Sequence, residues 1–359
     1  MCRVLHLVEH LYQGGIERLL EQLAKHSPKE RYSLYFYAYQ TEKLQGIGQK
    51  LQGHGTPVFC YNKPKGYDFK LLRELVHTVR HNNIQVIHTH DFGPMEYAIA
   101  LKARFPGLRL IHTHHTLHDF LRYPKYVFFF QFASLFYSQI VGVSDYVTEE
   151  LKSHCPIARR KLRTIYNGLD FAAFEPSVGR AELRPGRLRL VNVSRISAEK
   201  NLIHLLRTCA ALKAEGVDFE LHHAGSGSAE EELRLKQFVE NNGLGSQVFF
   251  HGFQEDVKGL LANGDIFVSP SFTEGHPVAV LEAMAAGLLC LCSDIPAHRL
   301  LSNDGILFFE LNGEDLLNKL REISKQPATY AALPARAQHN VRSSFSMERM
   351  IQEYGALYA

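Results

Sequence analysis

Short apolar runs alternate with longer stretches of helical periodicity along most of the chain. The runs predicted as strands cover residues 3–8, 34–39, 85–88, 108–113 and 139–143, and then residues 188–194, 219–224, 248–251, 265–269 and 288–292. Helical patterns lie between them, for example over residues 15–26, 69–82, 200–215 and 230–241. Strands that are apolar throughout and separated by helices are typical of parallel sheets covered on both faces. Because the pattern occurs twice, it predicts an α/β protein with two Rossmann-like, doubly wound lobes.

A stretch rich in turn-forming residues and poor in periodicity separates the two series. It runs from Tyr166 to Gly186 and is typical of a connection between domains. We expect it to join an N-terminal lobe over residues 1–170 to a C-terminal lobe over residues 171–344. With 359 residues, the chain is long enough for each lobe to bury its own core.

Composition and charge restrict the class of protein further. Six scattered cysteines without a C-x-x-C pair fit a reducing compartment. The sequence shows no leader segment and no spanning apolar stretch, so a cytoplasmic location is expected. Residues 1–170 carry 22 Lys and Arg against 14 Asp and Glu, whereas residues 171–359 carry 18 against 23, which suggests lobes with different partners. A net charge of only +3 and the absence of a reader motif argue against nucleic acid.

Two glycines follow the first predicted strand. In doubly wound lobes ligands bind beyond the carboxyl ends of the strands, so residues just after each strand are candidates for a site. Gly14 and Gly15 precede a helix, where glycine lets backbone N–H groups approach an anion. The G-x-G-x-x-G spacing of a dinucleotide site is absent. An anion site and a plain tight turn therefore both remain open.

Histidines gather after two strands of the first lobe. They are His88, His90, His112, His114, His115 and His118. Neither a cysteine partner nor an H-E-x-x-H helix accompanies them, which disfavours zinc. We expect them to form the polar lining of a cleft, with one histidine touching substrate and the others structural.

Two cations follow the first strand of the second lobe. Arg195 is suited to binding phosphate oxygens, and Lys200 adds a charge in what is predicted to be the first turn of a helix. Cations at a helix start oppose the helix dipole, and an anionic ligand would remove that conflict. A solvated charged turn is the alternative.

The candidate with the most specific spacing follows the strand at residues 265–269. Glu274 is expected in a loop and Pro277 at the first helical position, with Glu282 further along the same helix, about 7.5 Å along its axis. Val278 is expected on the buried side of this helix. Two carboxylates at this separation could contact two portions of one extended ligand.

Together these residues resemble family 4 of the retaining, nucleotide-sugar-dependent glycosyltransferases, whose GT-B fold has two Rossmann-like lobes facing a central cleft. The resemblance covers nearly the whole chain and rests most specifically on Glu274 and Glu282, the family's two glutamates separated by seven residues. The other matching segments are residues 14–18, 86–90, 113–115, 143–144, 165–170, 194–201 and 225–227. The fold also implies that the final helix, here over residues 345–359, packs back on the N-terminal lobe.

The resemblance implies a role for each matching residue. Arg195 and Lys200 would bind the donor diphosphate, and Glu282 the ribose hydroxyls. Glu274 would lie near the transferred sugar. The implied catalytic residues are Glu274, His115, Arg195 and Lys200, and the implied donor contacts are Gly14, Gly15, Arg195, Lys200, Gly225, Gly252, Phe253, Glu274, Gly275, His276, Pro277, Val278 and Glu282.

The implied activity is transfer of a hexosyl or N-acetylhexosaminyl group with retention of configuration, in surface polysaccharide synthesis. The donor would be a UDP-sugar, with a GDP-sugar as the alternative, and the acceptor a glycan or lipid-linked sugar. The cations and a helix start would stabilise the leaving diphosphate, so no metal or other cofactor is expected. His115 matches the histidine at the end of the fourth strand of the lobe, with His114 in the competing register. Gly-His-Pro follows Glu274 where the family has Gly-Phe-Gly, which leaves the donor sugar open.

Residues 120–137 are unusually aromatic and have two alternative placements. They lie in the basic lobe, with Arg159, Arg160 and Lys161 nearby in sequence, so they could meet an anionic membrane or a lipid-linked acceptor. Peripheral contact of this kind would occur at the cytoplasmic face of the inner membrane. Burial of the segment against the sheet is the alternative.

Two other functions compete with sugar transfer. A nucleotide-sugar epimerase of similar shape would convert its substrate without releasing UDP. A non-catalytic GT-B protein that only binds a partner would be expected to lack Glu282, Arg195 or Lys200, and all three are present.

Overall fold

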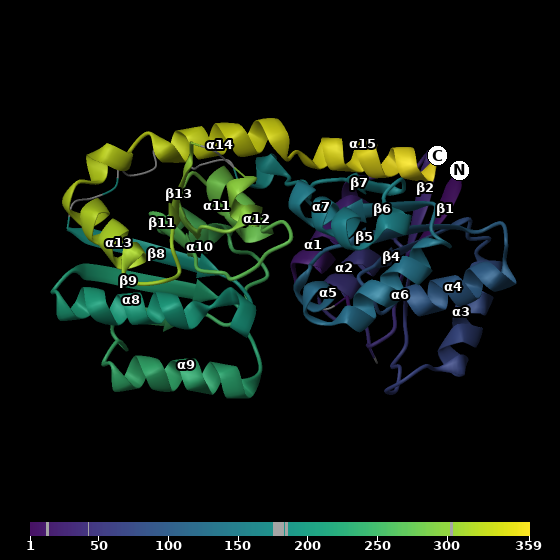
Figure 1. The fold of residues 1–359 in the computed structure, drawn as a ribbon, viewed down its shortest axis with the longest axis horizontal. Coiled ribbons are helices and arrows are strands. Elements are labelled where there is room, and N and C mark those ends of the chain that lie inside the picture. The colour runs from purple at the N-terminus through teal and green to yellow at the C-terminus, as the bar shows by residue number, and fades with distance from the viewer. Residues whose placement is uncertain (12–13, 42, 175–182, 184–185, 302–303) are drawn as a thin grey trace. The chain divides into compact units, whose positions relative to one another are not determined.

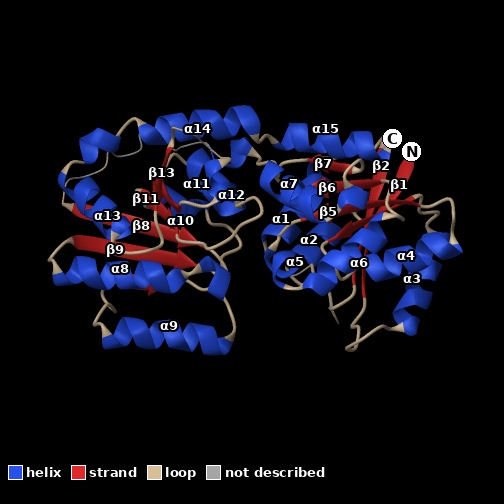
Figure 2. Cartoon of the chain, in the orientation of Figure 1, coloured by secondary structure: helices blue, strands red, loops and turns tan. Residues whose placement is uncertain are grey.

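A computed structural model describes residues 1–11, 14–41, 43–174, 183, 186–301 and 304–359. These residues form two compact units, one of Met1–Gly168 with Met347–Ala359 and one of Leu169–Ser346. Each unit is built on one parallel sheet with helices on both faces (Figures 1 and 2). The prediction of two doubly wound parallel sheets is confirmed. Most of the turn-rich stretch, residues 175–182 and 184–185, lies outside the described residues.

The first unit contains a seven-stranded sheet in the order β3-β2-β1-β4-β5-β6-β7. Its strands are β1 (Cys2–Val8), β2 (Tyr32–Ala38), β3 (Val58–Cys60), β4 (Val86–His90), β5 (Arg109–His114), β6 (Gln139–Gly142) and β7 (Leu162–Thr164). The strand order reverses between β1 and β4, and the switch point of such a sheet is where ligands bind. The sequence pattern missed the short strands β3 and β7, which have three residues each.

Helices cover both faces of this sheet. They are α1 (Gly15–His26), α2 (Ile47–Gly53), α3 (Phe69–His81), α4 (Met95–Arg104), α5 (His118–Arg122), α6 (Pro124–Ser134), α7 (Asp145–His154) and α15 (Met347–Tyr358), with a 3₁₀ turn at Pro156–Ala158. Alternation along β1 sends Leu5 and Leu7 into the core with α3 and α4, and Val4 and Val8 into the core with α1 and α15. Figure 1 shows α15 beside the N-terminal strand β1.

The second unit contains a six-stranded parallel sheet in the order β10-β9-β8-β11-β12-β13. Its strands are β8 (Arg187–Val193), β9 (Asp218–Ala224), β10 (Val248–Phe250), β11 (Ile266–Ser269), β12 (Leu289–Ser293) and β13 (Ile306–Phe309). Its helices are α8 (Leu202–Ala214), α9 (Ala229–Asn241), α10 (Lys258–Asn263), α11 (Val278–Ala285), α12 (Pro296–Arg299), α13 (Asp315–Lys325) and α14 (Leu333–Ser344), with 3₁₀ turns at Phe171–Phe174, Ala198–Lys200 and Pro327–Tyr330. Leu188 and Leu190 of β8 form its core with leucines of α8 and α13.

Local sequence explains where several helices begin. Asp68 accepts a hydrogen bond from the backbone N–H of Lys70 at the start of α3, and Ser144 accepts one from Val147 at the start of α7. Ser228 caps α9 in the same way. Each cap satisfies an N–H group that the helix itself leaves without a partner.

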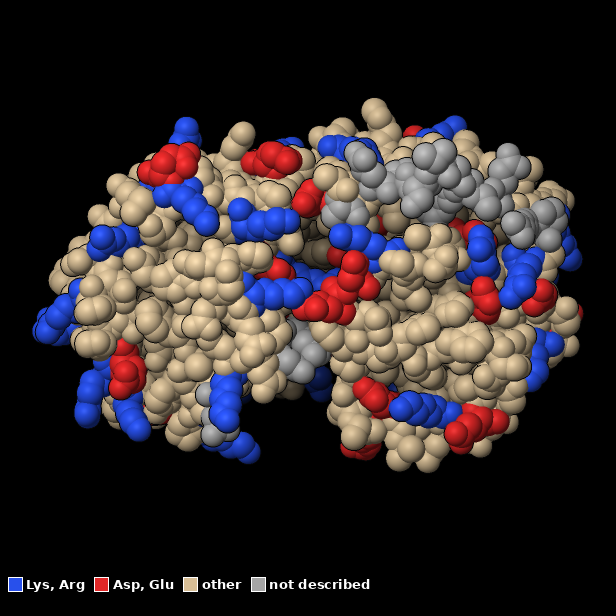
Figure 3. Space-filling model, turned by 180° about the vertical axis from the view of Figure 1, so that it is seen from behind, with Lys and Arg blue, Asp and Glu red and all other residues tan. Residues whose placement is uncertain are grey.

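Charged side chains of both signs are interspersed on the face of the molecule shown in Figure 3. Among the helices that the structure describes, none combines the length and the apolar character needed to cross a membrane.

Candidate functional site

Lys200 and Glu274 form an ion pair at the carboxyl ends of two neighbouring strands, β8 and β11. The Lys200 Nζ atom lies 2.7 Å from each carboxylate oxygen of Glu274. The two side chains are only 17% and 11% exposed, so water screens the pair little. Since β8 and β11 are adjacent in the sheet, the loops that follow them bring together residues that are 74 positions apart in the chain.

The surroundings of Glu274 keep it ionised. Burial alone would raise the pKa of this carboxyl, but the charge of Lys200 and hydrogen bonds from Lys200 and Ser271 outweigh burial and hold the pKa below its usual value. The Ser271 hydroxyl donates to Glu274 Oε1 over 2.7 Å. At neutral pH, Glu274 is therefore ionised, and its negative charge can stabilise positive charge on a ligand.

A polar network that the sequence analysis did not identify holds the loop before Glu274. His298 of α12 is fully buried, and its Nδ1–H donates to the carbonyl oxygen of Ser293 over 2.8 Å. Its other nitrogen, Nε2, then accepts from the Ser269 hydroxyl at 3.2 Å. The Ser293 hydroxyl donates to the Ser271 carbonyl over 2.6 Å. The only signal in the sequence is that these polar residues end or closely follow buried strands.

The predicted helix over residues 200–215 begins too early. Lys200 ends a 3₁₀ turn, Asn201 adopts a left-handed conformation with φ 51°, and α8 begins at Leu202. The expectation of Lys200 in the first turn of this helix is therefore wrong. The positive charge of Lys200 is already paired with the carboxylate of Glu274. The inferred conflict between this charge and the dipole of the following helix therefore does not arise. Arg195 is different, since its side chain is 71% exposed and lies 3.4 Å from Glu199 Oε1.

Two glycines let the loop after β9 pack directly on the loop that carries Arg195. A Cβ atom at Gly225 would lie 1.8 Å from the Ser194 carbonyl oxygen, and one at Gly227 would lie 2.3 Å from that of Ile196. Gly225 also has a φ of +146°, and its N–H donates to the Gly252 carbonyl over 2.8 Å. Any larger residue at Gly225 would separate these loops.

Helix α11 carries the second carboxylate. Pro277 is its N-cap residue, with ψ 90°, so the prediction of Pro277 at the first helical position is wrong by one residue. Val278 is half-buried, whereas all six residues from 280 to 285 are buried. The expectation of Val278 on the buried side of this helix is therefore met only in part, and the helix is buried all round from residue 280. Glu282 lies inside this buried run and is 7% exposed.

Gly275 and His276 are buried in the turn that precedes α11. The His276 ring lies edge-on to the ring of Phe345, with centroids 5.0 Å apart. Burial lowers the pKa of His276 to about 3, so the ring is neutral at physiological pH. Phe253 is half-buried beyond the end of β10.

In the first unit, Gly14 precedes α1 and Gly15 is its first residue, after β1 as the sequence predicts. Gly14 is the N-cap residue with a φ of +151°, and a Cβ atom at Gly15 would meet no other atom within 4 Å. The preceding Gln13 lies outside the described residues.

The histidines are buried inside the first unit, so the prediction that they line a cleft is wrong for most of them. His88, His112 and His114 have no exposed surface, and His115 is 8% exposed. His115 directly follows β5, which is the fifth strand of the unit and not the fourth, because the short β3 precedes it. His118 is half-buried at the start of α5.

His6 of β1, which the sequence analysis did not consider, joins His88 and His90. One ring nitrogen of each lies within 4.8 Å of those of the other two. The ring planes of these pairs are inclined by only 14° to 40°. His6 Nδ1 is hydrogen-bonded to His90 Nε2 at 3.0 Å, and His90 Nδ1 to His115 Nε2 at 3.0 Å, so both nitrogens of His90 are engaged within the protein.

The aromatic segment after β5 is divided between core and surface. Phe120, Phe130 and Tyr137 are buried, whereas Phe128 and Phe132 on α6 are 78% and 52% exposed. Burial against the sheet therefore describes only part of residues 120–137, and the other part is exposed.

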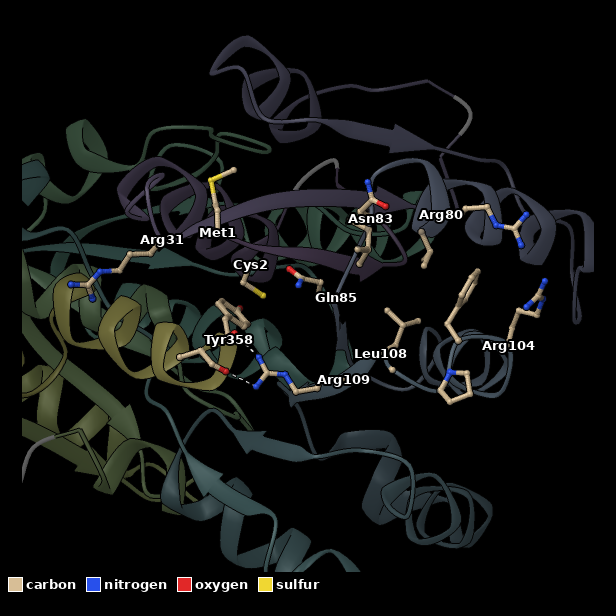
Figure 4. A pocket seen from close by; sticks show the side chains of 16 residues that line it. Met1, Cys2, Arg31, Arg80, Asn83, Gln85, Arg104, Leu108, Arg109 and Tyr358 are labelled. Carbon is tan, nitrogen blue, oxygen red and sulfur yellow. Dashed lines mark hydrogen bonds between the residues drawn. The ribbon is translucent and has the colours of Figure 1, made fainter.

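A cavity of about 980 Å³ lies at the amino end of the first sheet (Figure 4). Cys2, Gln85 and Tyr358 line it, together with Arg109, which donates hydrogen bonds to the backbone carbonyls of Tyr358 and Ala359. None of the candidate residues lines this cavity. It lies at the opposite end of the strands from the positions where doubly wound sheets bind ligands.

Comparison with known proteins identifies the family of this chain. Family models match residues 13–173 as Glycosyltransferase Family 4 and residues 178–340 as Glycosyl transferases group 1. The putative glycosyltransferase EpsF of Bacillus subtilis is 26% identical over 81% of this chain and 79% of its own length. An Escherichia coli enzyme, UDP-Gal:alpha-D-GlcNAc-diphosphoundecaprenol alpha-1,3-galactosyltransferase, is 24% identical over 84% of this chain and 82% of its own.

The fold is also similar to that of a known structure. The crystal structure of Anabaena Alr3699/HepE in complex with UDP-glucose superposes with a TM-score of 0.82 at 17% identity, over 99% of both chains. The two parallel sheets of seven and six strands have the GT-B fold. The chain belongs to glycosyltransferase family 4, and its relatives synthesise polysaccharides and lipid-linked sugars.

Proposed function

We propose that this glycosyltransferase binds a nucleoside-diphosphate sugar in its second unit and transfers the sugar to a glycan or lipid-linked acceptor. The observation that carries the proposal is the shielded Lys200–Glu274 pair together with buried Glu282. These groups supply one cation and two carboxylates for one extended, charged ligand. A UDP-galactose-dependent and a GDP-mannose-dependent relative are both 24% identical over 84% of this chain, so a UDP-sugar is proposed with a GDP-sugar as the alternative.

The second unit offers a partner for each part of such a donor. Two of the three N–H groups of Lys200 meet Glu274, and the third is proposed to bind the diphosphate with the exposed guanidinium of Arg195. Glu282 is proposed to accept hydrogen bonds from the ribose hydroxyls. The remaining proposed contacts are Gly225, Gly252 and Phe253 toward the nucleoside, and Gly275, His276, Pro277 and Val278 beside the sugar and diphosphate.

The charges suit the chemistry of transfer. As the bond between sugar and phosphate breaks, negative charge grows on the diphosphate and positive charge on the sugar ring. The positive charges of Arg195 and Lys200 would offset the negative charge that grows on the diphosphate, and the first N–H groups of α11 would add partial positive charge there. The ionised carboxylate of Glu274 would offset the positive charge on the sugar ring. Retention of configuration and independence of metal are part of the proposal. EDTA should leave the activity intact, and a complete loss that one divalent ion restores would contradict metal independence.

The first unit is proposed to supply the remaining groups. His115 is proposed as a catalytic residue that contacts the transferred sugar, in preference to His114, whose ring has no exposed surface. Gly14 and Gly15 are proposed to approach the donor diphosphate through backbone N–H groups.

Peripheral contact with an anionic membrane is proposed for α6. Phe128 and Phe132 lie four positions apart and so on one side of the helix, and both are exposed. Arg122 and Lys125 precede them in the chain and lie over the ring of Tyr123, 5.4 and 5.5 Å from its centroid. Exposed aromatic side chains beside cations fit an anionic lipid surface. The proposed location is the cytoplasmic face of the inner membrane.

A panel of sugar nucleotides tests the proposal. A UDP-sugar should raise the melting temperature more than the corresponding GDP- or ADP-sugar at equal concentration, because a ligand that binds the folded state more tightly stabilises it more. Acceptor-dependent release of UDP would then establish transfer. Conversion of the sugar without UDP release would support the epimerase alternative, and binding without either reaction would support the non-catalytic alternative.

A further inference from the structure

Alternation along three neighbouring strands divides the buried histidines between the two faces of the first sheet. His6 lies opposite His88 in the pairing of β1 with β4, and His90 lies opposite Thr113 in the pairing of β4 with β5. Since side chains alternate, all four point to the face covered by α1 and α15. His112 and His114 point to the other face, where Thr89 and Tyr137 join them.

On the α15 side, hydrogen bonds connect the rings into one chain. His115 Nε2 lies 3.0 Å from His90 Nδ1, and His90 Nε2 lies 3.0 Å from His6 Nδ1. His6 Nε2 lies 3.5 Å from the hydroxyl of Tyr358, which lies 2.8 Å from His88 Nδ1. Tyr358 of α15 is therefore the point at which His88 joins the chain that leads to His115.

The chain ends beyond His88 in two hydroxyl groups. His88 Nε2 lies 2.7 Å from Thr113 Oγ1, which lies 3.2 Å from the hydroxyl of Tyr354. Both tyrosines belong to α15 and are almost completely buried, at 3% and 1% exposed.

Each ring in this chain has a single proton to donate. Burial lowers the pKa of His6 and of His115 to about 3, and it holds those of His88 and His90 well below the usual value. A neutral imidazole has one N–H and one lone pair. If the proton of one ring moves to the other ring nitrogen, the proton of every ring hydrogen-bonded to it must move as well. The hydrogen bonds of the whole chain can therefore run in either of two directions.

The distances at Tyr358 favour one direction. A phenol O–H is more acidic than an imidazole N–H, so the shorter contact, 2.8 Å, is the one in which Tyr358 donates to His88 Nδ1. The oxygen of Tyr358 then accepts from His6 Nε2–H. In turn His90 Nε2–H donates to His6 Nδ1, and His115 Nε2–H donates to His90 Nδ1. Nδ1 of His115 is left with its lone pair.

We propose that Tyr358 is a positioning residue for His115, because the direction of its hydroxyl fixes the tautomer of each ring between them. His115 would then offer a hydrogen-bond acceptor at Nδ1, which suits a sugar hydroxyl. The inference rests on the proposed function only in assigning a sugar to His115.

The main chain of α15 holds Tyr358 in place. Arg109 of β5 donates to the carbonyl oxygens of Tyr358 and Ala359, the latter over 2.6 Å (Figure 4). The Tyr358 ring also lies edge-on to Tyr32 with centroids 5.4 Å apart. Removing the hydroxyl alone, as in Tyr358→Phe, therefore tests the hydrogen bonds while keeping the packing.

Nitrogen NMR of histidine side chains measures the tautomers directly, without any sugar nucleotide. In ¹⁵N-histidine-labelled protein, assigned by replacing single histidines, we expect His115 to show a protonated Nε2 and an unprotonated Nδ1. In Tyr358→Phe the N–H of His6 loses its acceptor, so Nδ1 of His115 should shift toward the protonated position. Tyr137→Phe removes an equally buried hydroxyl on the other face and should leave His115 unchanged.

Three results would overturn the inference. They are a protonated Nδ1 on His115 in the unmodified protein, unchanged His115 resonances in Tyr358→Phe, and equal changes in Tyr358→Phe and Tyr137→Phe. If Tyr358→Phe does not fold, the unmodified protein still decides through the first result. Failure of the proposed function would give a different result. The protein would then neither bind a sugar nucleotide nor transfer a sugar, while His115 would still show the expected tautomer.

Discussion

At the scale of single residues, Arg195 and Lys200 have different environments although their sequence context suggested a matched pair. Lys200 is shielded and bonded to both oxygens of Glu274, whereas Arg195 extends into solvent beside Glu199. The two cations should therefore differ in what their removal does to stability.

Lys200→Ala is expected to destabilise the second unit by about 3 kcal/mol, because it leaves the carboxylate of Glu274 shielded and without its cation. Arg195→Ala, the matched control, should change stability by less than about 0.5 kcal/mol, as is usual for an exposed side chain.

Both variants should lower turnover, since the partner of each cation gains charge in the transition state. Urea unfolding with kinetics of UDP release measures both effects. Equal stability losses would contradict the structural distinction, and normal turnover in both would contradict the diphosphate assignment.

Glu282→Ala is expected to weaken UDP binding about tenfold, because it removes one charge-assisted hydrogen bond to the ribose. Glu282→Gln keeps the size of the buried side chain and should lose less. Calorimetric titration with UDP measures the difference. Unchanged affinity in Glu282→Ala, with the fold intact, would assign the ribose to another residue.

At the scale of elements, α6 has one face in the core and one in solvent, with Phe130 buried and Phe128 and Phe132 exposed. The double variant Phe128→Ser/Phe132→Ser should reduce sedimentation with phosphatidylglycerol vesicles at least tenfold, because it removes apolar area from the contact. Phe69→Ser, which removes a 75% exposed ring on α3, is the matched control. Equal binding by all three proteins would exclude α6 as the lipid contact.

Sequence periodicity was sufficient for most elements but not for their contacts. Residues 4–8 are apolar except for His6, as is typical of a strand buried on both faces, whereas the three-residue strand Val58–Cys60 was missed. The pairing of Lys200 with Glu274 depends on β8 and β11 being neighbours. No local pattern encodes strand order, so the two residues could be proposed as one site only through the family resemblance.

His6 shows the same limit at the site. Its position in an apolar run suggested nothing but core, and its partners His88 and His90 lie more than eighty positions further along the chain. Once the register of β1 with β4 is known, alternation places all three rings on one face. The residue types were visible in the sequence, but their proximity was not.

At the scale of the whole molecule, buried neutral histidines should make stability depend on pH. Burial lowers the pKa of His6, His115 and His276 to about 3 and that of His114 and His223 to about 4. The unfolded chain binds protons near pH 6.5 and the folded protein does not, so this stability is complete above pH 6.5 and is lost as pH falls toward 3. Each such histidine should contribute about 1.4 kcal/mol per pH unit within that window.

Urea unfolding followed by circular dichroism tests this slope, since the chain has no tryptophan to report by fluorescence. His77→Gln, which changes an exposed histidine of α3, should leave the slope unchanged. An unfolding free energy that stays constant from neutral pH to about pH 5 would show that the buried rings take up protons in the folded protein.

The position of α15 also determines when the first unit can be completed during synthesis. Its strands and most of its helices leave the ribosome by Gly168, but α15 follows only after residues 169–346 have been made. Until then the face of the sheet that carries His6, His88 and Val86 lacks Tyr354 and Tyr358, which cover it in the finished protein. The second unit is contiguous in sequence and has no such delay. A released chain that ends at Ser346 should therefore contain a protected second unit and a first unit that still binds chaperones.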